Sequence, residues 1–239
     1  MTENIEYPIR INRYLELKAV ATRRAADDLI KAGLVKVNGK RAVVGQKIEV
    51  GDEVTVMENK SRPAKNLVYL AYYKPRGIAT HASTEGEKAI NMEEKYPGVF
   101  PVGRLDKDSE GLMILTNDGR VTERLLHPRF EHEKEYVVNV RERVLPVIKR
   151  MLEAGVVESG EKLKAKRVEI IDHHTLDIIL TSGKNHQIRR MLSEAHLTVE
   201  KLVRVRVMNI KGDKLKPGQV WMLTGKELNN FLQALGLNE

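Results

Sequence analysis

The chain has 239 residues, of which 41 are lysine or arginine and 33 are aspartate or glutamate, so its formal net charge is +8. This excess favours a polyanionic partner, either nucleic acid or an acidic membrane surface, although a merely basic protein would show it too. The chain has no cysteine, which excludes disulfides, thiolate zinc sites, iron–sulfur clusters and a cysteine nucleophile. Without a membrane-spanning apolar run or a signal peptide, a cytoplasmic protein is expected.

Residues 9–57 are predicted to form a small domain of two helices and a small sheet. A helical pattern begins at Arg10, and a second helix is expected between an N-cap at Thr22 and a closing Gly33. Alternation at 35–37 followed by Asn38-Gly39 predicts a hairpin, and strands are expected at 46–48 and 53–56. The domain carries a cluster of basic residues, which favours RNA binding over a solvated basic face: Arg10, Arg13, Arg23, Arg24, Lys36 and Lys40.

Residues 58–66 are polar and aperiodic and are predicted to be a linker to a large domain at 67–239. That domain opens with an apolar strand at 68–73, which ends in the turn Lys74-Pro75-Arg76-Gly77. Residues 83–98 carry little pattern and are expected to form a mobile loop.

A polar loop, residues 103–111, precedes the apolar run 112–116, which reads as a buried strand closed by a turn at Asn117-Asp118-Gly119. A loop fixed by a rigid strand is a common place for chemistry. This one offers the carboxylate of Asp106 close to Arg104. A charged surface loop is the alternative interpretation.

Further along, helices are expected at 121–126, 146–152 and 187–195, and strands at 136–140, 168–171 and 176–180. Tyr136 shares a face with Val138 and Val140, which favours a core tyrosine with its hydroxyl at the rim. Arg189 and Arg190 fall in the first turn of the helix from Gln187, a placement that can aim a guanidinium beyond the helix N-terminus.

Residues 201–210 alternate, with Arg204 and Arg206 on one face, which suits either phosphate contact or a solvated edge strand. Thr224-x-x-Glu227 is a capping box that predicts a final helix ending before Gly236. The mixture of alternating strands and irregularly spaced helices predicts an α+β fold around a mostly antiparallel or mixed sheet.

Four segments of the large domain resemble the motifs of the RsuA/RluB/RluE/RluF family of RNA pseudouridine synthases. They are Lys74-Pro75-x-Gly77, Gly103-Arg104-Leu105-Asp106 with Ser109-x-Gly111-Leu112, Lys134-x-Tyr136-x-Val138, and Gly183-Lys184-Asn185-x-Gln187-Ile188-Arg189-Arg190-Met191. Ser182 departs from the family, which usually has glycine or an acidic residue there. Residues 106–109, 185–191 and 206–209 are most similar to the RluF-like branch. The small domain resembles the S-four RNA-binding domain.

The resemblance implies a pseudouridine synthase catalytic domain in which Asp106 is the nucleophile, Arg189 pairs with it and Tyr136 contacts the target uracil. It implies base flipping, no cofactor and no metal. The expected partner is ribosomal RNA, most of all large-subunit (23S) RNA, with tRNA or small-subunit RNA as alternatives, and a monomer is expected. Further RNA contacts are predicted at Lys74, Arg104, Arg190, Arg204 and Arg206.

Two other interpretations remain open at this point. Asp106 and Asp108 form a D-x-D pair that can share magnesium for phosphoryl or sugar transfer, but no phosphate-binding G-x-x-x-x-G-K loop accompanies them. A non-catalytic RNA-binding or ribosome assembly factor would have the same small domain and the same charge. The aspartate, tyrosine and arginine in the family's chain order argue for the enzyme.

Overall fold

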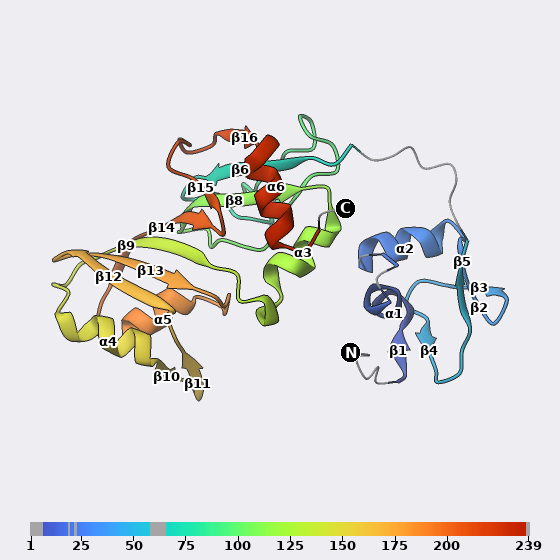
Figure 1. Cartoon of the computed structure of the whole chain (residues 1–239), viewed down its shortest axis with the longest axis horizontal. Helices are drawn as coiled ribbons and strands as arrows, with labels where there is room; N and C mark the ends of the chain where they lie inside the picture. Colours follow the sequence, from blue (N-terminus) through green and yellow to red (C-terminus); the bar gives the residue numbers. More distant parts are fainter. Residues whose placement is uncertain (1–6, 19, 22, 58–65, 238–239) are drawn as a thin grey trace. The chain divides into compact units, whose positions relative to one another are not determined.

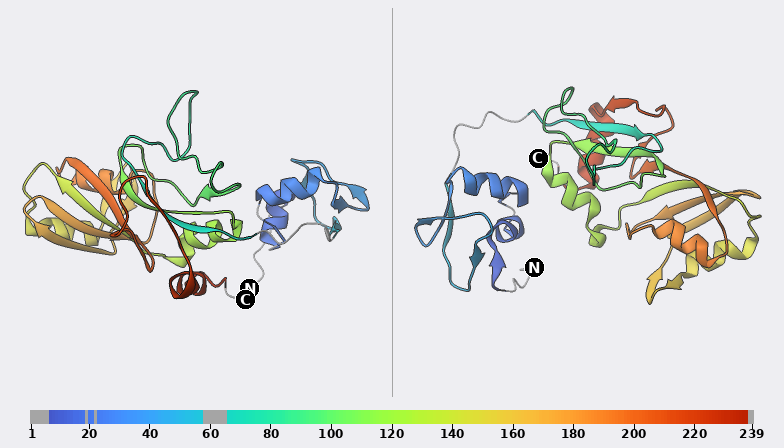
Figure 2. Two further views of the ribbon diagram at one scale, coloured as in Figure 1. Left: turned by 90° about the horizontal axis from the view of Figure 1, so that it is seen from above. Right: turned by 180° about the vertical axis from the view of Figure 1, so that it is seen from behind.

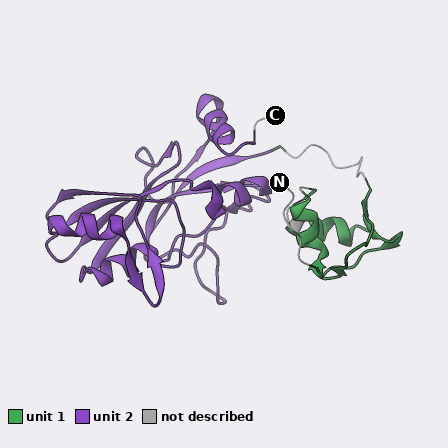
Figure 3. Ribbon diagram, turned by 60° about the horizontal axis from the view of Figure 1, so that its bottom comes forward, with its two compact units in different colours: residues 1–66 green, residues 67–239 purple. Residues whose placement is uncertain are grey.

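The computed structural model describes residues 7–18, 20, 21, 23–57 and 66–237, and it divides the chain into two compact units, residues 1–66 and 67–239 (Figure 3). The expected cap at Thr22 and nearly all of the expected linker lie outside the described residues, as does the side chain of Arg24. In these described ranges, no helix is long and apolar enough to cross a bilayer.

The first unit contains both predicted helices, α1 (Ile11–Leu17) and α2 (Arg23–Lys31). Asn38 and Gly39 have φ values of 50° and 76° and form the turn of the predicted hairpin. Its sheet has the order β3 (Lys40–Arg41), β2 (Val35–Val37), β5 (Val54–Val56), and a separate pair joins β1 (Ile9–Arg10) to β4 (Lys47–Ile48) (Figure 1). Its core is aliphatic: Ile11, Leu15, Ala26, Ile30, Val35, Val37, Ala42 and Ile48.

The second unit is built on one large sheet in which all strand pairs but one are antiparallel. The exception is the parallel pair β14–β8. The strand order is β12 (Arg167–Asp172), β13 (Thr175–Leu180), β9 (Lys134–Val140), β14 (Val199–Val207), β8 (Glu110–Thr116), β6 (Tyr69–Lys74), β16 (Val220–Met222). Shorter strands β7 (Phe100–Pro101) and β15 (Ile210–Lys211) pair with β8 and β14, and β10 (Val156–Glu158) with β11 (Glu161–Leu163) forms a separate hairpin. The α+β prediction is confirmed.

Both faces of this sheet are buried, which explains why β8 is apolar along almost its whole length. On one face α4 (Pro146–Ala154) and α5 (Gln187–Glu194) contribute to a core cluster with β9 and β13. On the other, α3 (Gly119–Leu126) and α6 (Gly225–Ala234) cover β6 and β8 through residues such as Val121 and Phe231. Figure 2 (left) shows α6, in dark red, on the face opposite the loop that contains residues 83–98. The short 3-10 helix Pro128–Phe130 follows α3.

One open alternative is decided and one local prediction is wrong. Strand β14 lies between β9 and β8, so it is a central strand, which excludes the interpretation as a solvated edge. Thr224 does precede α6, but its side chain makes no capping hydrogen bond, so the expected capping box is not formed. Asp118, predicted only as part of a turn, caps α3 by accepting a hydrogen bond from the backbone N–H of Arg120 at 3.1 Å.

Candidate active site

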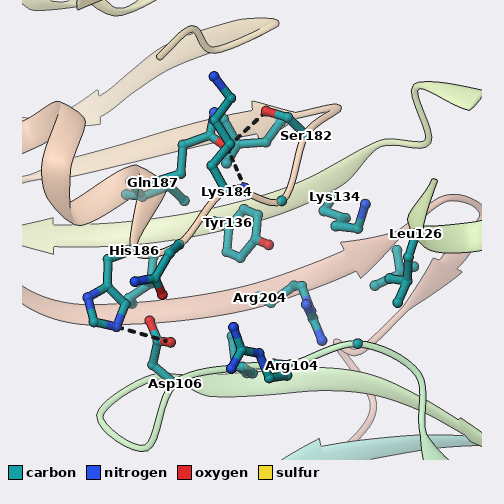
Figure 4. Close-up of a pocket in the computed structure, with 18 of the residues that line it drawn as sticks. Arg104, Asp106, Leu126, Lys134, Tyr136, Ser182, Lys184, His186, Gln187 and Arg204 are labelled. Atoms are coloured by element: carbon teal, nitrogen blue, oxygen red, sulfur yellow. Dashed lines mark hydrogen bonds and ion pairs between the residues drawn. The ribbon is translucent and has the colours of Figure 1, made fainter. Parts of the chain in front are cut away.

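A pocket of about 480 Å³ opens on the second unit where the 102–106 loop, β9, the start of α5 and β14 come together (Figure 4). This volume falls in the range of about 300–1,000 Å³ that is usual for small-ligand sites. The residues that line the pocket come from several segments of the chain, from Val102 to Val207. They include all three residues predicted to be catalytic: Asp106, Tyr136 and Arg189.

Asp106 stands on a loop that is fixed on both sides. The backbone N–H of Leu105 donates to Thr80 Oγ1 at 3.0 Å, and the Thr80 hydroxyl donates to the Leu105 carbonyl at 2.7 Å. The N–H of Gly77 donates to the Lys107 carbonyl at 2.8 Å. The Asp106 side chain is 38 % exposed, so the carboxylate faces the pocket while its backbone is held in place.

Lys74 supports this loop and is not an RNA contact, which corrects the prediction. Its side chain is fully buried, and the ammonium donates to the carbonyls of Pro75 at 3.0 Å, Ile78 at 2.6 Å and Lys107 at 3.4 Å. Burial lowers the pKa of Lys74 to about 8. The lysine therefore ties the end of β6 to the residue after Asp106.

Tyr136 is buried in the core and also forms a wall of the pocket. It lies on β9 directly opposite Arg204 on β14. Figure 4 shows its ring between Asp106 with His186 on one side and Lys134 with Leu126 on the other. The core placement predicted from the alternation is confirmed, and the same side chain is available to a ligand.

Arg189 does not pair with the Asp106 carboxylate, contrary to the expectation from the family. Its guanidinium donates to the Asp108 carbonyl and to Ser109 Oγ, both at 3.4 Å. The partner of Asp106 is His186, whose Nε2 lies 3.5 Å from Oδ1. Sequence reasoning missed His186, since it occupies the unspecified position of the motif Gly183-Lys184-Asn185-x-Gln187.

Gln187 is a second residue to which the sequence pattern assigned no role. It is buried, and its Oε1 accepts hydrogen bonds from Ser182 Oγ at 2.8 Å and from the N–H of Lys184 at 3.2 Å. Its Nε2 donates to the Lys164 carbonyl at 3.3 Å. These bonds fix the 182–187 loop that brings His186 to the pocket.

Two cations line the inner wall, Lys134 and Arg204. Lys134 is 8 % exposed and donates to the His132 carbonyl at 3.3 Å; Arg204 is 5 % exposed and its Nε donates to the Leu112 carbonyl at 2.6 Å. Burial, with the charge of Arg204 beside it, lowers the pKa of Lys134 to about 8. Arg204 was predicted as a phosphate contact on an exposed face, whereas the central position of β14 turns it into the pocket.

Two other arginines predicted to bind RNA form ion pairs with glutamates. Arg190 pairs with Glu158 and, at 2.8 Å, with Glu161 of the β10–β11 hairpin. Arg206 pairs with Glu135 and, at 3.0 Å, with Glu133. Since these contacts already neutralise both guanidinium groups, neither is free to neutralise a phosphate.

The remaining predicted contacts lie on the surface. Arg104 is exposed and lines the pocket. In the first unit Arg10, Arg23 and Lys40 are exposed, Lys36 is half-buried, and Arg13 pairs with Glu16 of the same helix at 2.5 Å. Within the described part of the chain, no three histidine or carboxylate side chains lie together in the manner of a metal site.

Comparison with known proteins agrees with this arrangement. A family described as RNA pseudouridylate synthase matches residues 68–194, and the S4 domain family matches residues 9–54. The chain is 37 % identical to the dual-specificity RNA pseudouridine synthase RluF of Escherichia coli (strain K12), over 95 % of this chain and 79 % of the relative. It is 36 % identical to an uncharacterised RNA pseudouridine synthase of Aquifex aeolicus over 96 % of both chains. A crystal structure of a pseudouridylate synthase superposes with a TM-score of 0.68 at 26 % identity, covering 95 % of this chain and 99 % of that one.

These features define a class of protein: an α+β enzyme with a carboxylate on a fixed loop beside a buried tyrosine, joined to an RNA-binding domain. The chain belongs to the RsuA-like family of RNA pseudouridine synthases that carry an N-terminal S4 domain. It is an isomerase that acts on uridine in RNA.

Proposed function

We propose that this enzyme converts one uridine of ribosomal RNA, in the large subunit (23S RNA), to pseudouridine with Asp106 as the nucleophile. One observation carries the role of Asp106: it is the single carboxylate among the described residues that line the pocket. The second candidate substrate is tRNA, because the relative at 37 % identity is named a dual-specificity enzyme. Small-subunit RNA is the third.

The chemistry requires the bond between the uracil N1 and the ribose to break, the base to turn, and its C5 to join the sugar. A carboxylate that forms a covalent adduct divides this into two easier steps. Asp106 is held for this by the hydrogen bonds of its loop, and Arg189 braces the loop through the Asp108 carbonyl and Ser109. Tyr136 forms the wall against which the base lies.

The target uridine must leave its stack to reach Asp106, so RNA loops and bulges are the favoured targets, because flipping is easier there. The basic residues of the first unit hold the RNA by its phosphates without reading sequence. A docking module joined by a short connection raises the effective RNA concentration at the pocket. The proposal includes a monomeric enzyme, and ribosomal RNA as substrate supports a cytoplasmic site of action.

The test is release of tritium from RNA labelled at C5 of uracil, with ribosomal RNA transcripts and a tRNA pool assayed separately. We expect release by the wild type from a large-subunit transcript and none by Asp106→Asn. The matched control is Asp108→Asn, two residues further along the same loop, which we expect to remain active. Residual turnover above a few per cent in Asp106→Asn would remove this residue from the role of nucleophile.

Two other outcomes separate the alternatives. Equal loss in both variants, with a metal requirement at the chemical step, would favour the D-x-D interpretation. Intact RNA binding with no release from any transcript would contradict free ribosomal RNA as the substrate and point to a partly assembled ribosomal particle.

A further inference from the structure

The inner wall of the pocket holds two cations for which the described residues supply no counterion. Lys134 and Arg204 are both more than nine-tenths buried, and within the described part of the chain their hydrogen bonds run to the backbone carbonyls of His132 and Leu112. Among the described residues, neither side chain lies within ion-pair distance of a carboxylate. They are neighbours, because Arg204 is paired across the strands with Tyr136, and Lys134 lies two residues from Tyr136 on the same face of β9.

Two arginines close to these cations, by contrast, do have carboxylate partners. Arg206 lies two residues from Arg204 on the same strand and has two glutamate partners, and Arg190 also has two. An uncompensated buried cation destabilises a fold. Two adjacent ones facing a cavity therefore indicate that the negative charge is supplied by whatever enters it.

The isomerisation supplies such a charge on the uracil itself. If Asp106 attacks the ribose C1′, the electron pair of the C1′–N1 bond leaves with the base, and the anion is shared between N1 and the two carbonyl oxygens. C5 then attacks C1′ and expels the carboxylate; the C5 proton goes to solvent and N1 takes one up. If Asp106 attacks C6 instead, the ring electron pair moves onto O4. Both routes place negative charge on the carbonyl oxygen O4 of the ring, and the first places it on O2 as well.

We propose that Lys134 and Arg204 bind the carbonyl oxygens of the detached uracil and stabilise the negative charge that develops there, which makes Lys134 a further catalytic residue. The proposal rests on the proposed function. Fixed donors in a water-poor pocket stabilise a developing charge more strongly than water does. In Figure 4 Tyr136 lies between Asp106 and Lys134. A uracil ring beside Tyr136 would therefore have the Asp106 carboxylate on one side and the cations on the other.

The first experiment needs no RNA and no turnover. The full chain is titrated at pH 7 with uracil, which is neutral, and with 5-nitrouracil, which is ionised, and affinity is read from thermal shift and calorimetry. We expect the wild type to bind the ionised base at least tenfold more tightly than uracil, Lys134→Arg to keep most of this preference, and Lys134→Met to lose it. Equal affinities in the wild type, or no detectable binding of the ionised base, would overturn the proposal.

The second experiment measures RNA affinity and the single-turnover rate separately, on a transcript from which the wild type releases tritium. We expect Lys134→Met to lower the single-turnover rate at least 100-fold while RNA affinity stays within threefold, with partial recovery in Lys134→Arg. The control Lys149→Met removes a half-buried cation of α4, paired with Glu169 and outside the pocket lining, and is expected to change neither quantity. A rate within threefold of wild type in Lys134→Met overturns the inference. If the wild type releases no tritium from any RNA, the proposed function fails while the first experiment still decides the uracil site.

Discussion

Lys134→Met should stabilise the free enzyme at neutral pH even though it removes a residue needed for turnover. The pKa of Lys134 falls from 10.5 to about 8 in the folded chain. Each pKa unit corresponds to about 1.4 kcal/mol, so the charged lysine opposes folding by about 3 kcal/mol below pH 8. Methionine keeps the length of the side chain and carries no charge. It leaves the His132 carbonyl without its donor, which costs about 1 kcal/mol, so the net gain is about 2 kcal/mol at pH 7.

The sign of the pH dependence follows from the direction of the shift. Because the folded pKa lies below the unfolded value, the unfolded chain binds more protons between pH 8 and 10.5, and wild-type stability rises through that window. The variant lacks the group, so its advantage should be complete at pH 7 and absent above pH 10.5. A gain of 2 kcal/mol corresponds to a rise in Tm of about 4–8 °C for a domain of this size.

Urea denaturation followed by tryptophan fluorescence measures this, because the single tryptophan, Trp221, lies in the second unit and reports on the unit that contains Lys134. The control Lys149→Met, which breaks a surface ion pair with Glu169, should stay within about 1 kcal/mol of wild type. A destabilised Lys134→Met at pH 7, or the same difference at pH 7 and above pH 10.5, would refute the argument that the lysine is buried as an uncompensated cation.

Three further outcomes are expected. Gly111→Ala should destabilise the second unit by more than about 3 kcal/mol in the same assay, because its β-carbon would lie 2.3 Å from the Arg204 carbonyl oxygen and its φ is +112°. The control Gly218→Ala, at positive φ but with open space around it, should lower the free energy of unfolding by only about 1 kcal/mol. Replacing Lys36 and Lys40 by glutamine should reduce the slope of log affinity for RNA against log salt by up to about 2, and an unchanged slope in filter binding would show that the hairpin does not touch phosphate. Arg190→Met should leave that slope unchanged, since this guanidinium pairs with two glutamates, and a reduced slope would restore it as an RNA contact.

The predicted elements and the structure agree where the signal is local. The α2 helix, the Asn38-Gly39 hairpin, the strands β8 and β9 and the helix α5 all arise from periodicity or turn chemistry within a few residues. The shortest strands, such as β7 and β16, were missed because two or three residues carry no period, and β16 pairs with β6, about 150 residues earlier in the chain.

The sequence by itself determined the α+β class, the two parts of the chain and the loop that presents Asp106. Only the tertiary structure decided which cations are buried, which are paired with carboxylates and which face the pocket. Lys74 lies at the end of a strand and reads as a surface residue, yet contacts up to 33 residues away bury it beneath the Asp106 loop. Arg204 and Arg206 share one alternating strand. Because β14 lies between β9 and β8, the side chain of Arg204 faces the pocket. Arg206 is neutralised by Glu133 and Glu135, which lie more than 70 residues away in the chain. Such pairings depend on strand order, which no local pattern encodes.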